Sequence, residues 1–364
     1  MIKKIDDYPR LFGIVNSNRD YATPYSWGKN QFNSSFPTAL ACYLYSKKMK
    51  AVYIKTDETL RPIIDYIAID ELFNCNPLSN NTYFAFEAAY SPYQKYLIGS
   101  VPRNDLVLQD LQTNKCVRSL EIKLTALPDN STCLLQESEF GSEIVVRPDT
   151  IIYLACSIIE QYNNFSELAE QILPVANKIT DWINAKGIIP HIPEIKECLL
   201  RLVKSKKDVQ TPIIMEPIWK TKGKSSQLAE KCLDIFVWSN FALFTIFFPD
   251  NCEEIISISR HTRTMIWLFK MLCDYVKKGH FNGKQIIDEL SYNTKNDKAF
   301  ATSGIKTHRI MMCPELITPR ISKDEIKSII LGGGQNLLSP ERRFDAIIYN
   351  SPDLFEAGEL SESY

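Results

Sequence analysis

The sequence predicts a mixed α/β core with a large helical elaboration, on the strength of two observations. Strand-like alternation and turn residues are concentrated in the first half of the chain, whereas helical spacing dominates the second half. No long Gly/Ser-rich linker divides the two. We therefore expect residues 1–165 to form a core with an N-terminal arm. Residues 166–364 should form a mainly helical region, which can pack with the core as one compact domain.

The elements expected in the first half follow from local patterns. Serine favours the N-cap of a helix, and a short alternating run favours a strand. In chain order we expect a helix starting at Ser34 or Ser35 and running through FPTALACYLYSKKM, a strand at 50–55, a helix at 60–73, and at 83–90 an element that fits either a helix or a strand.

Further along the chain, Pro148 suits the first turn of a helix at 149–162. The other expected elements follow from the spacing of apolar residues, which repeats as in a helix or alternates as in a strand. They are a strand pair within 133–146, helices at 165–185, 193–206, 225–247 and 254–278, a strand at 213–219, a short helix at 322–331 and a last strand at 343–350.

The composition is that of an ordinary globular chain. It has 364 residues, 45% hydrophobic and 23% charged, and 42 basic against 43 acidic residues leave a net charge of -1. This balance gives no sign of a nucleic-acid partner, and any such partner would have to meet a local basic surface. Ten cysteines and four histidines are dispersed without a CxxC pair. This argues against a zinc site of ordinary spacing and favours a reducing, cytoplasmic location.

The sequence also predicts no membrane association. The N-terminal stretch MIKKIDDYPRLFG lacks the apolar run of a signal peptide. The most apolar later segment, 235–248, contains Ser239 and Asn240 and is shorter than the ~20 residues that a spanning helix needs. We expect a buried core helix there.

One charged hairpin stands out in the first half. Residues 105–111 and 116–125 alternate as two strands around a polar turn. Glu121 and Lys123 are two residues apart and therefore share a face. Antiparallel pairing places Asp105 beside one of them, whereas Asp110 falls roughly 16 Å away at ~3.3 Å per residue. For Asp105 to lie on the same face as Glu121 and Lys123, the loop between the strands must have an odd length or a strand must contain a β-bulge.

The Glu-Ile-Lys triplet alone is weak evidence. It also occurs at 194–196 and 325–327, where it begins an amphipathic helix and reads as solvated surface. Only Glu121-Ile122-Lys123 lies in a strand pattern, in which Ile122 packs into the core. An Asp and a Glu that converge with a Lys suit Mg²⁺ binding and hydrolysis of a phosphodiester. A surface salt-bridge ladder between two strands is the competing interpretation.

The pattern D-x(15)-ExK formed by Asp105, Glu121 and Lys123 resembles the PD-(D/E)XK nuclease signature, with Asn104 where that signature usually has Pro. Further segments resemble type II restriction endonucleases of the HindVP/HgiDI group, from about residue 10 to about residue 350. They are LFGIVNSNRDY, SWGKNQFNSSFPTALACY, EIKLTALPD, EIVVRPDTIIYLA, PIWKTKGKS and LSPERRFDAIIYN.

This resemblance implies a PD-(D/E)XK-like mixed sheet flanked by helices and an Mg²⁺-dependent endonuclease that cuts double-stranded DNA at a short palindrome. The group is associated with GRCGYC sites. A palindrome implies a homodimer, and a host needs a protecting DNA methyltransferase. By the resemblance Asp105 and Glu121 are metal ligands and Lys123 is the catalytic lysine. Glu87 is a further candidate ligand, with an ordinary helix-surface glutamate as the alternative.

Basic or amide-rich segments provide candidate DNA contacts, although each alone also fits a solvated loop. The candidates are Lys29, Asn30, Gln31, Lys220, Lys222, Lys224, Arg260, Arg263, Lys306, His308 and Arg309. Two other functions stay open at this point. One is a repair or defence nuclease of the same superfamily, and the other is a non-enzymatic binding protein with a coincidental charged hairpin.

Overall fold

The computed structural model describes most of the first 205 residues and shorter stretches beyond them. The described residues are 14, 16–18, 29–56, 62–122, 144–146, 148–162, 164–205, 213–214, 219–222, 225–228, 237–238, 258, 260–292 and 300–302. None of the helices described in these ranges is long and apolar enough to cross a membrane.

The described elements mix strands and helices along the chain. The strands are β1 (Ala51–Thr56), β2 (Pro62–Ile67), β3 (Thr82–Ala89), β4 (Arg103–Asp110), β5 (Lys115–Leu120), β6 (Ile144–Val146), β7 (Ile213–Ile214), β8 (Trp219–Lys222), β9 (Ser225–Leu228), β10 (Val237–Trp238) and β11 (Phe300–Thr302). The helices are α1 (Lys29–Ser46), α2 (Ile69–Phe73), η2 (Ser91–Tyr96), α3 (Pro148–Gln161), α4 (Phe165–Ala176), α5 (Ala185–Ile188), η3 (Ile189–His191), α6 (Ile192–Ser205), α8 (Arg260–Lys278) and α9 (Gly283–Glu289).

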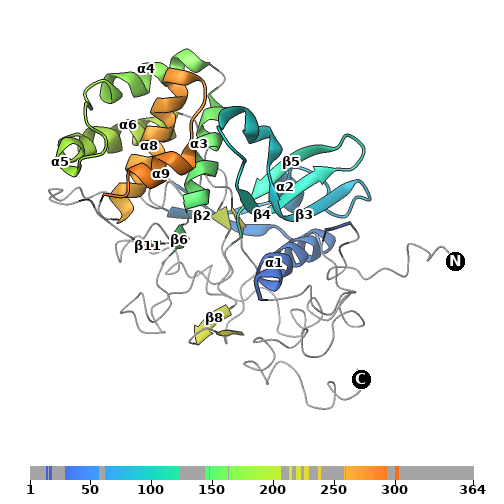
Figure 1. The fold of residues 1–364 in the computed structure, drawn as a ribbon. Coiled ribbons are helices and arrows are strands. Elements are labelled where there is room, and N and C mark those ends of the chain that lie inside the picture. Colours follow the sequence, from blue (N-terminus) through green and yellow to red (C-terminus); the bar gives the residue numbers. More distant parts are fainter. Residues whose placement is uncertain are drawn as a thin grey trace.

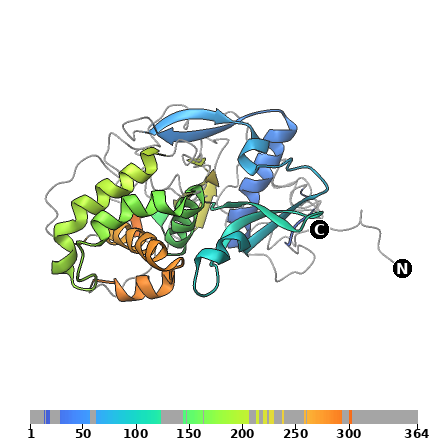
Figure 2. The ribbon, with the colours of Figure 1, turned by 90° about the horizontal axis from the view of Figure 1, so that it is seen from above.

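Two groups of elements lie on either side of α3. Figure 1 shows the sheet β3–β4–β5 on one side with α1 and α2, and helices α4, α5, α6, α8 and α9 on the other. The view from above in Figure 2 has the same separation. Strands from both halves of the chain also pair, β1 with β7 and β6 with β11. The structure therefore confirms a mixed α/β fold in which the two halves share sheets.

The sheet β3–β4–β5 is an antiparallel meander that carries the charged hairpin. Its central strand β4 carries three consecutive buried residues, Leu106, Val107 and Leu108, as expected of a strand covered on both faces, and Leu120 of β5 is also buried. Truncating such a leucine to alanine costs about 2–5 kcal/mol of stability. The ambiguous element at 83–90 is β3, a strand.

The N-terminal segment adds to the free edge of β3. Ser17 forms a parallel bridge with Phe84, and the Phe84 backbone bonds to Asn16 O at 3.0 Å and to Asn18 N at 3.3 Å. The Asn18 side chain then continues the ladder. Its Nδ2 donates to Phe86 O and its Oδ1 accepts from Phe86 N, both at 2.8 Å.

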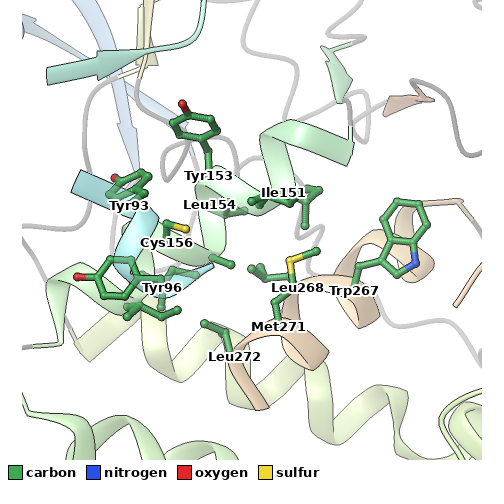
Figure 3. Packing of buried hydrophobic residues seen from close by; sticks show 14 of the residues in the cluster. Tyr93, Tyr96, Ile151, Tyr153, Leu154, Cys156, Trp267, Leu268, Met271 and Leu272 are labelled. Carbon is green, nitrogen blue, oxygen red and sulfur yellow. The ribbon is translucent and has the colours of Figure 1, made fainter. Parts of the chain in front are cut away.

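Helix α3 is the centre of the core. Residues 150–156, 158 and 159 of α3 are all buried, as expected of a helix largely surrounded by protein. Figure 3 shows Ile151 and Leu154 of α3 among Leu268, Met271 and Leu272 of α8. This packing fixes the helical group to the sheet group. The predicted helix at 149–162 is confirmed, with Pro148 at its first position.

Four helix predictions in the described region need correction, two of them before residue 75. Helix α1 begins at Lys29, so Ser34 and Ser35 lie inside it and do not cap it. Within 60–73 the chain forms β2 and only a short α2, because the apolar run PIIDYI pairs with β1 in a full antiparallel ladder. Helical spacing in so short an apolar run does not exclude a strand.

The helix predicted at 225–247 is also wrong where the structure describes it. Strand β9 pairs with β8 in a hairpin, and β10 pairs with β7. The helix predicted at 165–185 ends earlier, at Ala176. Helices α6 and α8 confirm the predictions at 193–206 and, from Arg260 on, at 254–278. The elements predicted within 133–143, 322–331 and 343–350 lie outside the described residues.

Candidate active site

Asp105 lies near the start of the central strand β4, next to the end of β5. The register pairs Leu106 with Leu120 and Val107 with Ser119, and continuing it by one step places Asp105 opposite Glu121. The carboxylate Oδ2 of Asp105 accepts a hydrogen bond of 2.7 Å from Ile122 N. The structure thus brings Asp105 to the Glu121 end of the hairpin, as the sequence predicted.

A β-bulge produces this register. The turn between the strands has four residues, Leu111–Asn114, which alone would not put the two carboxylates on one face. The pairing shifts between Leu108 and Gln109, so that one extra residue of β5 is accommodated. The bulge was one of the two routes to same-face pairing that the sequence left open.

Glu121 is a buried carboxylate next to an apolar layer. It is 8% exposed, and its neighbours Leu120 and Ile122 are both in the core, as predicted. Burial raises the pKa of the nearby Tyr153 phenol, and the charge of Glu121 adds to this rise. Glu121 therefore contributes negative potential where α3 meets the sheet.

Asp110 has a different task at the opposite end of β4. Its Oδ1 accepts from Thr113 N at 2.8 Å and from Thr113 Oγ1 at 3.1 Å. The backbone hydrogen bond from Thr113 is the main reason that the pKa of Asp110 is lowered. Asp110 thus stabilises the turn and lies away from Asp105, in agreement with the sequence prediction.

Asn104 is held firmly where nuclease signatures usually have proline. It is 3% exposed, its Nδ2 donates to Ser119 Oγ at 2.6 Å, and its Oδ1 accepts from Asp105 N at 3.1 Å. The side chain therefore fixes the backbone of Asp105.

Glu87 lies across from Asp105 on the other neighbouring strand. Phe86 pairs with Leu106 and Ala88 with Asn104, so Glu87 stands between these pairs, opposite Asp105. Its φ of 50° is left-handed, which is strained for a residue with a Cβ. Glu87 is thus on a strand, and the alternative of a helix-surface glutamate is wrong.

Glu87, Asp105 and Glu121 therefore occupy neighbouring positions on three adjacent segments of the sheet. In the described part of the chain, however, no three His, Cys, Asp or Glu side chains are close enough to hold a metal ion together. Lys123 lies outside the described residues, one position beyond Ile122. The described part of the site therefore consists of Asp105 opposite Glu121, with Glu87 on the neighbouring strand β3.

The candidate DNA contacts lie on several elements. Lys29, Asn30 and Gln31 begin α1, Lys220 and Lys222 are in β8, and Arg260 begins α8. Lys224, Lys306, His308 and Arg309 lie outside the described residues.

Arg263 is a correction to this set. It is 1% exposed, its Nη1 donates to Ser291 O at 3.1 Å, and its guanidinium lies 5.1 Å from the centre of the Trp267 ring. Its long side chain packs inside the helical group, where it cannot reach a DNA phosphate in this conformation. A basic residue near a helix start gave no local sign of this burial.

Three residues near the carboxylates were not singled out from the sequence. Arg103 is two residues before Asp105. Because strand residues two apart share a face, the sequence could have indicated that Arg103 lies on the same face as Asp105. Asn18 and Tyr153 join the site from distant parts of the chain, so no local pattern points to them. The Tyr153 hydroxyl accepts from Tyr90 N at 2.9 Å and donates to Pro102 O at 2.8 Å, which ties the end of β3 to the start of β4.

Fold and site together define a mixed α/β protein with opposed carboxylates on an antiparallel meander, a donor set suited to a divalent cation. Comparison with known proteins is more specific. The family model described as HindVP restriction endonuclease matches residues 27–355. The chain belongs to the HindVP restriction endonuclease family and is, by this homology, a type II restriction enzyme.

Two curated relatives cover nearly the whole chain. One is the "Type II restriction enzyme HgiDI" of Herpetosiphon aurantiacus, 47% identical over 351 residues, which are 96% of this chain and 97% of the relative. The other is the "Probable type II restriction enzyme HindVP" of Haemophilus influenzae, 47% identical over 351 residues and 95% of each chain. No solved structure matches the chain significantly. The resemblance to this group is therefore confirmed, and a non-enzymatic binding protein is excluded.

Proposed function

We propose that the chain hydrolyses phosphodiester bonds of double-stranded DNA at a short palindromic site, with Mg²⁺ as cofactor and Asp105, Glu121 and Lys123 as catalytic residues. The observation that carries this proposal is the strand register that sets Asp105 opposite Glu121. Type II restriction enzymes generally use divalent metal ions, and family membership supports the DNA substrate. By resemblance to the group, the site is GRCGYC-like.

The described residues fit magnesium better than a metal that needs a full protein cage. Mg²⁺ commonly takes one or two carboxylates and completes its shell with water and substrate phosphate. Asp105 and Glu121 would hold the ion, and Glu87 is the candidate third acid. When bound, the ion supplies a more acidic water and neutralises phosphate charge.

The protein residues have separate tasks in this proposal. Ile122 N and Asn104 orient the Asp105 carboxylate by the hydrogen bonds given above. The buried Glu121 is kept near the apolar layer, where electrostatic interactions are stronger than in water. Lys123, two residues after Glu121 in the sequence, would orient the attacking water and stabilise negative charge that develops on the phosphate.

Twofold symmetry of the site implies that two copies of the chain act together as a homodimer. We assign catalysis to residues 1–165 and DNA recognition and dimerisation to residues 166–364. Lys29, Asn30, Gln31, Lys220, Lys222, Lys224, Arg260, Lys306, His308 and Arg309 stay candidate DNA contacts. A host DNA methyltransferase of the same specificity is the expected functional partner.

The test is plasmid cleavage in Mg²⁺ by purified Lys123→Ala and Glu121→Gln proteins, with sequencing of the ends that the unaltered protein leaves. We expect one recurrent palindrome, loss of cleavage in both variants, and retained specific DNA binding. Glu87→Gln reports whether the third acid is needed. Full cutting by Lys123→Ala would refute the catalytic assignment, and scattered ends would indicate a structure-specific repair or defence nuclease.

A further inference from the structure

A hollow of about 600 Å³ lies beside the candidate active site, where β3 ends and β4 begins. Glu87 and Ala89 of β3 line one wall, and Arg103 of β4 lines the other. Asn18 of the N-terminal segment and Ser100 complete it. A volume of this size is within the range of sites that bind small molecules or parts of a polymer.

Arg103 is placed to act together with Asp105. The two residues are two apart on β4, which puts them on one face at a separation of roughly 7 Å. The register holds Arg103 opposite Ala89, and the Tyr153 hydroxyl fixes the preceding carbonyl of Pro102. The backbone that carries Arg103 is therefore anchored on both sides.

The side chain of Arg103 is exposed and makes no hydrogen bond or ion pair with the described residues. Ser100 is also exposed and equally without such a partner. Asn18, by contrast, uses both polar atoms of its amide on the Phe86 backbone. Among the described side chains that line the hollow, Arg103 and Ser100 are consequently exposed donors without a partner in the protein.

The residues that line this hollow suit an anionic group that belongs to a larger molecule. Ala88 and Ala89 line it with small side chains, so a bulky group can approach the Arg103 guanidinium. Arginine binds phosphate with two parallel hydrogen bonds, and serine hydroxyls are common additional phosphate donors. Glu87 lines the same hollow and repels an anion, which makes the positive charge of Arg103 necessary.

We infer that this hollow binds a backbone phosphate of the cleaved DNA strand, next to the phosphodiester that reacts at Asp105, with Arg103 as the main donor and Ser100 as the second. The inference rests on the proposed function because it takes the reacting phosphodiester to lie at Asp105. Arg103 is in this view a substrate-positioning residue that sets how the strand lies across the carboxylate pair.

The test uses short duplexes that contain the mapped cut site, each with one uncharged methylphosphonate at a different position of the cleaved strand. Cleavage is compared for the unaltered protein and for Arg103→Gln. The unaltered protein should lose about ten- to a hundredfold in kcat/KM when the phosphate bound by Arg103 is neutralised. Arg103→Gln should show a similar loss on ordinary DNA and no further loss at that one position.

A second readout is binding in the Lys123→Ala background, measured over a range of salt concentrations. Adding Arg103→Gln should reduce the slope of log K against log salt by about 0.9, the value for one lost phosphate contact. Lys115→Gln is the matched control. Lys115 is also exposed and basic but lies at the far end of the hairpin, opposite Asp110, and should keep the slope.

The outcomes separate this inference from the function on which it rests. Normal cleavage and an unchanged salt slope in Arg103→Gln, or equal sensitivity of both proteins to every methylphosphonate, would overturn the phosphate subsite and leave the catalytic assignment intact. Cleavage by the Lys123→Ala protein would overturn the catalytic assignment. Thermal melting of Arg103→Gln at the unaltered temperature confirms that the variant is folded.

Discussion

Replacing Asp105 by asparagine and by alanine separates two tasks of its carboxylate. Its Oδ2 accepts a 2.7 Å hydrogen bond from Ile122 N, beyond the last residue of β5. Ile122 is buried, so water cannot readily replace this acceptor. Asparagine keeps an oxygen at this place, whereas alanine leaves the Ile122 N–H without its partner.

The two variants should therefore differ in stability. A hydrogen bond to a charged group contributes about 1.5–3 kcal/mol, and one between neutral groups about 0.5–1.5 kcal/mol. We expect Asp105→Asn to cost about 1 kcal/mol of unfolding free energy and Asp105→Ala about 2–3 kcal/mol. Both remove a proposed metal ligand, and both should slow plasmid cleavage at least about a hundredfold.

Urea unfolding measures the first quantity, and plasmid cleavage in Mg²⁺ measures the second. Gel-shift binding to the mapped site shows that each variant is folded enough to recognise DNA. Cleavage by Asp105→Asn at the unaltered rate would show that the carboxylate only terminates the β4–β5 ladder. Equal stability of the two variants would contradict the structural role of the Ile122 hydrogen bond.

Two further predictions concern the surroundings of the site. Tyr153→Phe leaves the Tyr90 N–H and the Pro102 carbonyl without the hydroxyl that joins them, and should cost about 1–3 kcal/mol in urea unfolding. An unchanged midpoint would show that water replaces the hydroxyl. For Glu160, burial raises the pKa, and Lys95 partly opposes this rise. Because the folded state binds the Glu160 proton more tightly than the unfolded state, Glu160 lowers the free energy of unfolding as pH rises through its raised pKa. Below its ordinary pKa of 4.5 this loss of stability is absent. Glu160→Gln should consequently melt at a higher temperature than the unaltered protein at pH 7, and the two should converge near pH 4. A difference that does not depend on pH would contradict this reasoning.

Local sequence pattern was enough to predict the hairpin and much of the helical framework. Alternation around the polar turn predicts both strands, and the two-residue spacing of Glu121 and Lys123 predicts their shared face. The helices around Pro148 and at 193–206 follow from apolar spacing that repeats over several turns. These features depend on neighbours within a few residues, which is why one sequence suffices.

Other features depend on which distant segments meet. The strand β2 forms because β1 offers a partner along its whole length, and Arg263 is buried because the chain near Ser291 and Trp267 encloses it. The position of Glu87 opposite Asp105 likewise follows from the β3–β4 register. Local spacing carries no information about these pairings.

The sequence alone predicted the class of enzyme, because segments along most of the chain resemble the HindVP/HgiDI group, and that family is confirmed. Residue type and strand spacing predicted Asp105, Glu121 and Lys123 as the catalytic set, which stays a proposal. The fold determined how the carboxylates meet. The bulge between Leu108 and Gln109 brings Asp105 and Glu121 to one face, and Asn18 joins the edge beside Glu87 across almost seventy residues of chain. Strand pairing and packing act over distances in sequence that no local periodicity encodes.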